Sequence, residues 1–136
     1  MLRIHILAAA SALCFSTFLT GCNDGLPRAS ISGKVTLDGK PLEQGLIAFA
    51  PLDGKSGTGG GPIEKGVYKA EVPLGSFRVT ISGTKTTGKK KVYDTPDSPM
   101  ADVLEELVPP KYNRDSKLTQ KIKGNQSDVH FDLTTK

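Results

Sequence analysis

Apolar and polar side chains alternate along several short stretches of this chain, and this alternation constrains the fold more than any other feature. The period of two is clearest in residues 31–37, 76–82 and 128–134. This is the pattern of strands with one face buried and one face in water. Fifteen glycines, nine prolines and no tryptophan also favour short strands joined by turns. The sequence therefore predicts an all-β domain.

Three more stretches have the composition of strands, namely residues 44–51, 66–73 and 118–123. Between the first two strands, Asp38-Gly39 followed by Lys40-Pro41 predicts a tight turn, because Asp-Gly tolerates positive φ. Residues 53–62 are rich in glycine and are expected to form a mobile loop.

The connection over residues 83–117 is longer than bare coil usually is. Its middle has the signals of one short helix, with Ser98 as N-cap, Pro99 at the first position and residues 101–107 as the body. Domains built from such short strands close as two packed sheets. We therefore expect a sandwich of about seven short strands, with one short helix as an option within 83–117.

Four apolar side chains near the end of this connection have two interpretations. They cover an open end of the sandwich, or, if exposed, they form a site for a partner. The side chains are those of Leu104, Leu107, Val108 and Tyr112.

The N-terminus has the organisation of a secretory signal peptide. Arg3 precedes the apolar stretch 4–20, and the small residue Gly21 comes just before Cys22. The stretch carries several hydroxyl side chains and is shorter than the roughly 20 residues that a spanning helix needs. These features favour a cleaved leader over an uncut anchor.

The segment Leu19-Thr20-Gly21-Cys22 resembles the lipobox of bacterial lipoproteins. The resemblance implies that residues 1–21 are removed and that the thiol of Cys22 carries a diacylglyceryl group. Two acyl chains suffice for stable anchoring. We accordingly expect residues 22–29 to be the lipidated cysteine and a tether, and residues 30–136 to be one domain.

This organisation predicts an extracytoplasmic protein held at a membrane by lipid. Asn23 favours the outer membrane over the inner membrane. Cys14 would leave with the leader and Cys22 would be modified, so no internal disulfide is expected. Loss of Arg3 would lower the formal charge from +4 to +3, which is too mild to require a nucleic-acid partner.

Four lysines in residues 85–91 form the candidate anion contact, for lipid headgroups or envelope polysaccharide. Five carboxylates in residues 94–106 follow them and are expected to compensate part of their charge. Apart from Tyr93 no aromatic side chain lies among the lysines, so base stacking is not supported. The lysines are Lys85, Lys89, Lys90 and Lys91.

Catalytic and metal chemistry find little support. After cleavage His130 would be the one histidine, on the outward face of its strand, and neither a zinc ligand set nor a catalytic triad can be assembled from it. Gly54-Lys55-Ser56 lacks the first glycine of a phosphate loop, because position 49 is Phe. The acidic residues lack the spacing of a calcium loop. We expect no enzyme and no cofactor.

The strands also resemble a known family. Residues 31–42 and 45–51 are similar to the opening of carboxypeptidase regulatory-like domains, which are β-sandwiches of prealbumin (transthyretin) type. Residues 75–79 resemble the Pro-Gly-x-Tyr-x-Val strand of that family, although Leu74 and Phe77 replace its proline and tyrosine.

Residues 109–113, 116–119 and 131–133 look like the C-terminal half of small planctomycete-type lipoproteins. Together these resemblances imply a Greek-key-like prealbumin-type fold and no catalytic activity. The expected function is a lipid-anchored envelope module with a structural or binding role, its partner an envelope protein or polysaccharide. The competing hypothesis is a carrier of a small ligand or carbohydrate that uses the mouth between the sheets or the connection 83–117. A pocket lined by clustered polar groups near this connection would favour the carrier.

Overall fold

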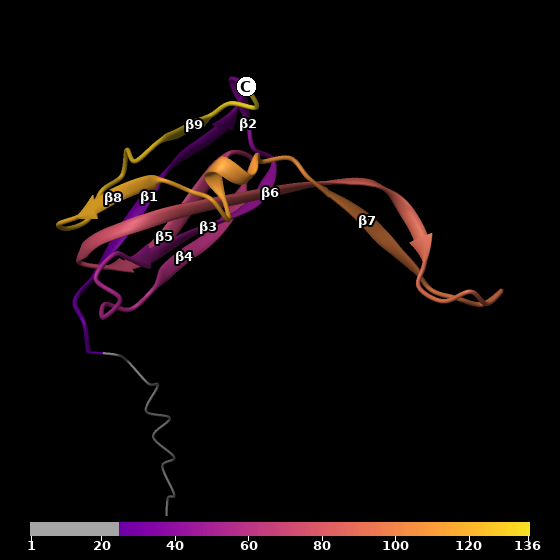
Figure 1. Cartoon of the computed structure of the whole chain (residues 1–136), viewed down its shortest axis with the longest axis horizontal. Helices are drawn as coiled ribbons and strands as arrows, with labels where there is room; N and C mark the ends of the chain where they lie inside the picture. The colour runs from indigo at the N-terminus through magenta and orange to yellow at the C-terminus, as the bar shows by residue number, and fades with distance from the viewer. Residues whose placement is uncertain (1–24) are drawn as a thin grey trace, which may run out of the picture.

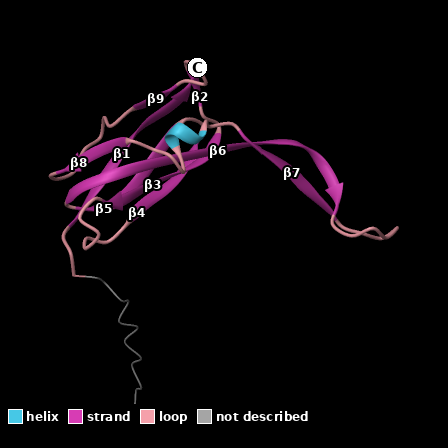
Figure 2. Cartoon of the chain, viewed as in Figure 1, coloured by secondary structure: helices cyan, strands magenta, loops and turns pink. Residues whose placement is uncertain are grey.

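The computed structural model describes residues 25–136. The expected signal peptide and lipidation site, including Cys22, lie outside the described residues. The described part is all-β apart from one 3-10 turn, as expected (Figure 2). Its elements are β1 (Arg28–Leu37), β2 (Lys40–Pro41), β3 (Gln44–Pro51), β4 (Gly59–Glu64), β5 (Val67–Pro73), β6 (Gly75–Lys91), β7 (Met100–Glu106), η1 (Pro110–Tyr112), β8 (Leu118–Ile122) and β9 (Phe131–Leu133).

The strands form one curled sheet in the order β2-β1-β5-β4-β3-β6-β7. β8 adds antiparallel to the first half of β6, and β9 adds parallel to β1. The C-terminal segment therefore runs from one end of the curl to the other and gives a sandwich-like body (Figure 1). The Tyr68 hydroxyl donates a hydrogen bond of 2.8 Å to the carbonyl oxygen of Val129 in this segment. Burial raises the pKa of Tyr68, so the phenol stays a donor.

The core is filled by the alternate side chains that the sequence pattern places inward. Phe49 lies at its centre, with ring centroids 6.4 Å from Phe77 and 6.5 Å from Tyr68. Such tilted and edge-on aromatic pairs stabilise beyond the area that they bury. The other fully buried side chains are Ile31, Val35, Leu42, Ile47, Ile63, Val72, Val79, Ile81, Val108, Ile122 and Leu133.

The turn between β1 and β2 is confirmed. Asp38 and Gly39 both have positive φ, at 51° and 78°. Two successive positive φ angles match the right-handed twist of the flanking strands.

The prediction of a mobile loop over residues 53–62 is wrong for its second half, which is strand β4. The glycines are required there by close packing of neighbouring backbones. A Cβ on Gly61 would lie 2.3 Å from the carbonyl oxygen of Lys69, and one on Gly60 would lie 2.6 Å from that of Ile47. Glycine content therefore marks a tightly packed strand in this segment.

The helix predicted over residues 98–107 is also wrong, because Met100–Glu106 is strand β7. β6 was expected to end near residue 82, yet it continues to Lys91 and pairs with β7. The capping signal at Ser98 and Pro99 belongs to the turn that joins the two strands. The helical residues of the connection form the single turn η1.

Two boundaries also differ from expectation. β1 begins at Arg28, and Ala29 is buried, so the body starts two residues before residue 30. The last strand was expected over residues 128–134, but β9 covers Phe131–Leu133.

The chain enters the body at one end, and the β6–β7 extension leaves from the other. Arg28 pairs with Pro73 beside the turn that leads into β6. At the far end, Gly33 and Gly83 lie in one row of paired residues across the sheet. The row runs from Gly33 through Tyr68, Ile63 and Gly45 to Gly83. β6 leaves the body beyond this row, and Figure 1 shows the extension projecting from it.

Candidate functional site

The projecting extension is a two-stranded ribbon, which we call the arm and define as residues 84–106. Thr84 pairs with Glu106 at its base, and Lys91 pairs with Met100 at its far end. The register shifts between Thr86 and Gly88, where the Thr87 hydroxyl donates to the carbonyl oxygen of Val103. A ribbon of two strands has an unpaired edge on each side and marginal stability in water.

The four lysines predicted to contact an anion all lie on β6 within the arm, but they do not converge. Lys85 and Lys90 pair with Glu105 and Ala101 on one face of the ribbon, and the other two pair with Asp102 and Met100 on the opposite face.

Neighbouring carboxylates and carbonyls occupy three of these ammonium groups. Lys85 lies 3.3 Å from Glu105, Lys89 lies 3.9 Å from Asp102, and Lys91 donates to the carbonyl oxygen of Thr95. The expected charge compensation is thus visible across the two strands. Both ion pairs are exposed, so each contributes little to stability.

One carboxylate fixes the base of the arm. Oε1 of Glu106 accepts hydrogen bonds from the backbone N–H of Gly83, at 2.8 Å, and of Val108, at 3.0 Å. It therefore joins β6 to the segment that returns to the body after β7. Sequence reasoning treated Glu106 as one of several surface acids and missed this role.

The far end of the arm presents apolar side chains to solvent. Val92, Tyr93 and Met100 are 48%, 65% and 55% exposed. The turn that carries them is held by hydrogen bonds from the N–H of Val92 to the carbonyl oxygen of Pro99, at 3.0 Å, and from the N–H of Tyr93 to the Ser98 hydroxyl, at 2.7 Å. A held turn with exposed apolar groups is suited to contact a partner.

The segment after β7 settles the two interpretations of the apolar residues 104–112. Val108 is 1% exposed, and Leu107 and Tyr112 pack against the core, as covering residues should. Leu104 is instead 59% exposed on the arm. Covering is therefore confirmed for three of these side chains, while Leu104 adds to the exposed apolar surface.

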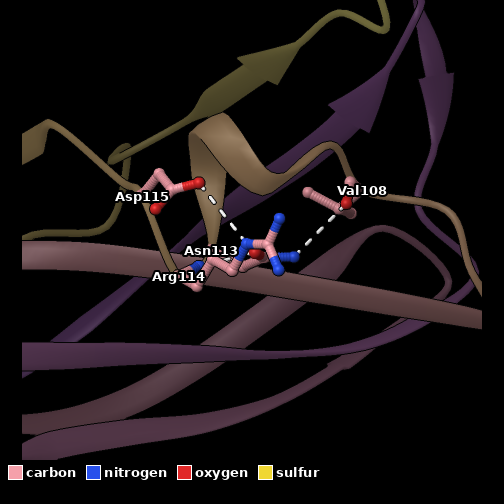
Figure 3. Close-up of polar contacts among 4 residues, drawn as sticks. All are labelled: Val108, Asn113, Arg114 and Asp115. Atoms are coloured by element: carbon pink, nitrogen blue, oxygen red, sulfur yellow. Dashed lines mark hydrogen bonds and ion pairs between the residues drawn. The ribbon is translucent and has the colours of Figure 1, made fainter.

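Polar contacts hold this returning segment in place (Figure 3). The Asn113 side-chain amide donates to the carbonyl oxygen of Val108, at 3.3 Å, and Nε of Arg114 lies 3.4 Å from Asp115. Ser116 is buried, and its hydroxyl donates to the carbonyl oxygen of Val79 on β6.

A groove of about 420 Å³ lies where the arm meets the body. Its apolar wall includes Leu37, Pro41, Leu42 and Leu107, and the first residues of the arm form its other side. A polar hollow of about 600 Å³ lies elsewhere, over residues 120 and 125–130. The groove at the base of the arm thus has a mainly apolar wall, whereas the carrier hypothesis predicted a polar pocket near the connection. A second hollow of about 390 Å³ lies within the connection, over residues 106–110, 113 and 114.

His130 is exposed, as expected, although it lies just before β9 rather than on a strand. Its Nδ1 accepts a hydrogen bond of 2.9 Å from the backbone N–H of Lys34. Across residues 25–136, no three or more His, Cys, Asp or Glu side chains come together in a way that could hold a metal ion. Within the same range, no helix is long and apolar enough to cross a membrane.

Comparison of the chain with models of protein families, with curated proteins and with solved structures finds no match.

Proposed function

We propose that this chain is a lipid-anchored, non-catalytic module of a bacterial envelope that binds an envelope partner through its arm. The observation that carries this function is the position of the arm at the end of the body opposite Arg28, where the chain enters. The exposed apolar side chains at its far end supply the contact surface.

The proposed anchor gives the arm a direction. Six residue steps separate Cys22 from Arg28, so the tether spans at most about 20 Å. β1 then runs the length of the body, and its ten residues add roughly 33 Å. A lipid on Cys22 would keep the Arg28 end near the bilayer and present the arm on the side away from it. The partner is therefore expected away from the anchoring membrane surface.

The resemblance to carboxypeptidase regulatory-like domains supports the same function. Such domains are spacers or binding modules without catalytic groups of their own. The curled all-β sheet is compatible with the prealbumin-type topology that the resemblance implies.

The arm is tested by replacing Tyr93 with a photo-crosslinking amino acid in the full chain, in intact cells. Leu52 is the matched control, because it is 50% exposed but lies outside the arm. We expect a discrete adduct with an envelope protein or polysaccharide from position 93 and none from position 52. The same adducts from both positions, or none from position 93, would contradict binding through the arm.

The anchor is tested by metabolic labelling with a fatty acid. We expect label in the wild-type chain and in Cys14→Ser, and none in Cys22→Ser. Equal labelling of the wild type and Cys22→Ser would rule out the proposed anchor.

A carrier of a small ligand or carbohydrate is the second candidate, favoured by the groove at the base of the arm. Its apolar wall suits an apolar ligand. Thr86→Trp would fill the groove, and Ser127→Trp, in the distant polar hollow, is the control. Native mass spectrometry of the protein from the envelope should then show a bound small molecule that Thr86→Trp alone removes. A wild-type chain without a bound molecule would count against the carrier.

A further inference from the structure

From Leu46 to Ala50, strand β3 is apolar on both of its faces. Ile47 and Phe49 are buried in the core, as expected for an inward face. On the outward face Leu46 is 60% exposed, and Ala48 and Ala50 are exposed too. A strand that meets water on one side normally carries polar residues there, whereas a strand covered on both sides reads as a continuous apolar run. β3 therefore has the composition of a strand whose outer face is covered.

The pairing register arranges this outer face in two adjacent rows. Leu46 lies opposite Pro62 on β4 and Ser82 on β6, while Ala48 lies opposite Gly60 and Thr80. On β5, Glu71 pairs with Gly60, and Lys69 falls beside Pro62 because Ile63 pairs with Tyr68. We call these rows the Leu46 row (Lys69, Pro62, Leu46, Ser82) and the Ala48 row (Glu71, Gly60, Ala48, Thr80).

The two rows complement each other in size and in charge. The Leu46 row holds the larger apolar side chains and a lysine, and the Ala48 row holds the smaller residues and a glutamate. Lys69 and Glu71 are both exposed.

We propose that a second copy of this chain covers the outer face, with a two-fold axis that crosses the strands between the two rows. This symmetry lays the Leu46 row of one copy over the Ala48 row of the other. Leu46 then meets Ala48, Pro62 meets Gly60, and Lys69 meets Glu71. Each contact occurs twice.

The next rows outward are compatible with the same axis. Thr84 of one copy would lie over Arg78 of the other, and Gln44 would lie over Ala50. No like charges oppose one another in these contacts on β3 and β6. On β1, at the margin of the face, the same axis brings Lys34 of one copy over Arg28 of the other.

Other occupants fit this face less well. A polysaccharide is commonly held on aromatic rings, but the rings of Phe49, Tyr68 and Phe77 lie in the core. A partner of one charge sign would pair with Lys69 or with Glu71 and repel the other. A second copy offers an opposite charge to each of these two side chains.

The size of the face sets the expected strength of association. The face spans four strands and four rows of side chains, which is roughly 19 by 27 Å at the spacings of a regular sheet. This is about 500 Å² per copy, below the roughly 800 Å² of a standard interface. The dimer should therefore form and dissociate with protein concentration.

Sedimentation equilibrium of the full chain in detergent, over a range of concentrations, measures this association. We expect reversible dimers for the wild type. Lys69→Glu and Glu71→Lys should each weaken dimerisation by roughly tenfold or more, because each places like charges opposite each other twice. The double variant restores both pairs and should dimerise like the wild type.

Lys90→Glu is the control for a change of net charge, since Lys90 is exposed on the arm, beyond the last row of the outer face. It should leave dimerisation unchanged. Leu46→Arg, which places a charge against Ala48, should yield monomers, with circular dichroism confirming the fold. A wild type that stays monomeric at every concentration, or a double variant as weak as the single ones, would overturn the proposal. The axis points the arms of the two copies in opposite directions, so one arm of an anchored dimer would face the bilayer. The dimer and binding through an arm that points away from the membrane are therefore alternatives for the anchored chain. The inference depends on neither Cys22 nor the arm, so it can fail while the proposed function stands.

Discussion

At the scale of single residues, two carboxylates each accept hydrogen bonds from two backbone amides. Glu106 accepts from Gly83 and Val108 at the base of the arm. Asp53 accepts from the N–H of Lys55 and Ser56 and from the Ser56 hydroxyl. Hydrogen bonds to an ionised acceptor are stronger than neutral ones. Both acids should therefore control local order more than global stability.

Glu106→Gln should loosen the base of the arm. The neutral amide is a weaker acceptor, and the loss of about 1 kcal/mol should speed hydrogen exchange at the Gly83 and Val108 amides roughly fivefold. Glu105→Gln is the matched control, because Glu105 makes one exposed ion pair with Lys85. Equal exchange in the two variants would show that Glu106 does not fix the arm.

The stability of the turn that Asp53 holds should depend on pH. Hydrogen bonds from Ser56 and Lys55 lower the pKa of this carboxyl from 3.8 to about 2. Because the folded-state pKa is the lower one, the stabilisation is complete above about pH 4 and is lost as the pH falls towards 2. An NMR titration should find the Asp53 midpoint near 2, and Asp53→Asn should remove this part of the acid dependence of unfolding. A midpoint near 3.8 would contradict the turn geometry.

At the scale of elements, the sequence predicts strands well where one face is buried and fails where neither face is buried. The alternation of Phe77, Val79 and Ile81 identified the first half of β6. This alternation does not show that β6 continues to Lys91, because the arm has no buried face that would produce it. The sequence predicts a helix in place of β7 because Ser98 and Pro99 are helix signals, and no residue of β7 is buried to produce the alternation of a strand.

The candidate site was also predictable only in part, because the pairing of its two strands cannot be read from the sequence. Lys85 and Glu105 could be singled out as charged, and mutual compensation was expected. Their pairing across two strands depends on the register, which the sequence does not reveal. Val92 and Met100 gave no signal, since single apolar residues in a long connection are common.

At the scale of the whole molecule, the body should survive a cut in the arm. Trypsin is expected to cleave first after Lys89, Lys90 or Lys91, in the exposed ribbon. The two fragments should then stay together, because β8 pairs with β6 and β9 pairs with β1. Size-exclusion chromatography of the nicked chain measures this. Separation of the fragments, or a first cut inside the body, would contradict the described division into body and arm.

The central claim is that residues 84–106 form a two-stranded arm beyond the body, and NMR cross-strand contacts test it most directly. The full chain in detergent should show backbone contacts between Lys91 and Met100 and between Lys89 and Asp102, the pairs set by the register. Contacts three residues apart along 100–107, without those across the strands, would show a helix in place of β7 and would contradict the arm.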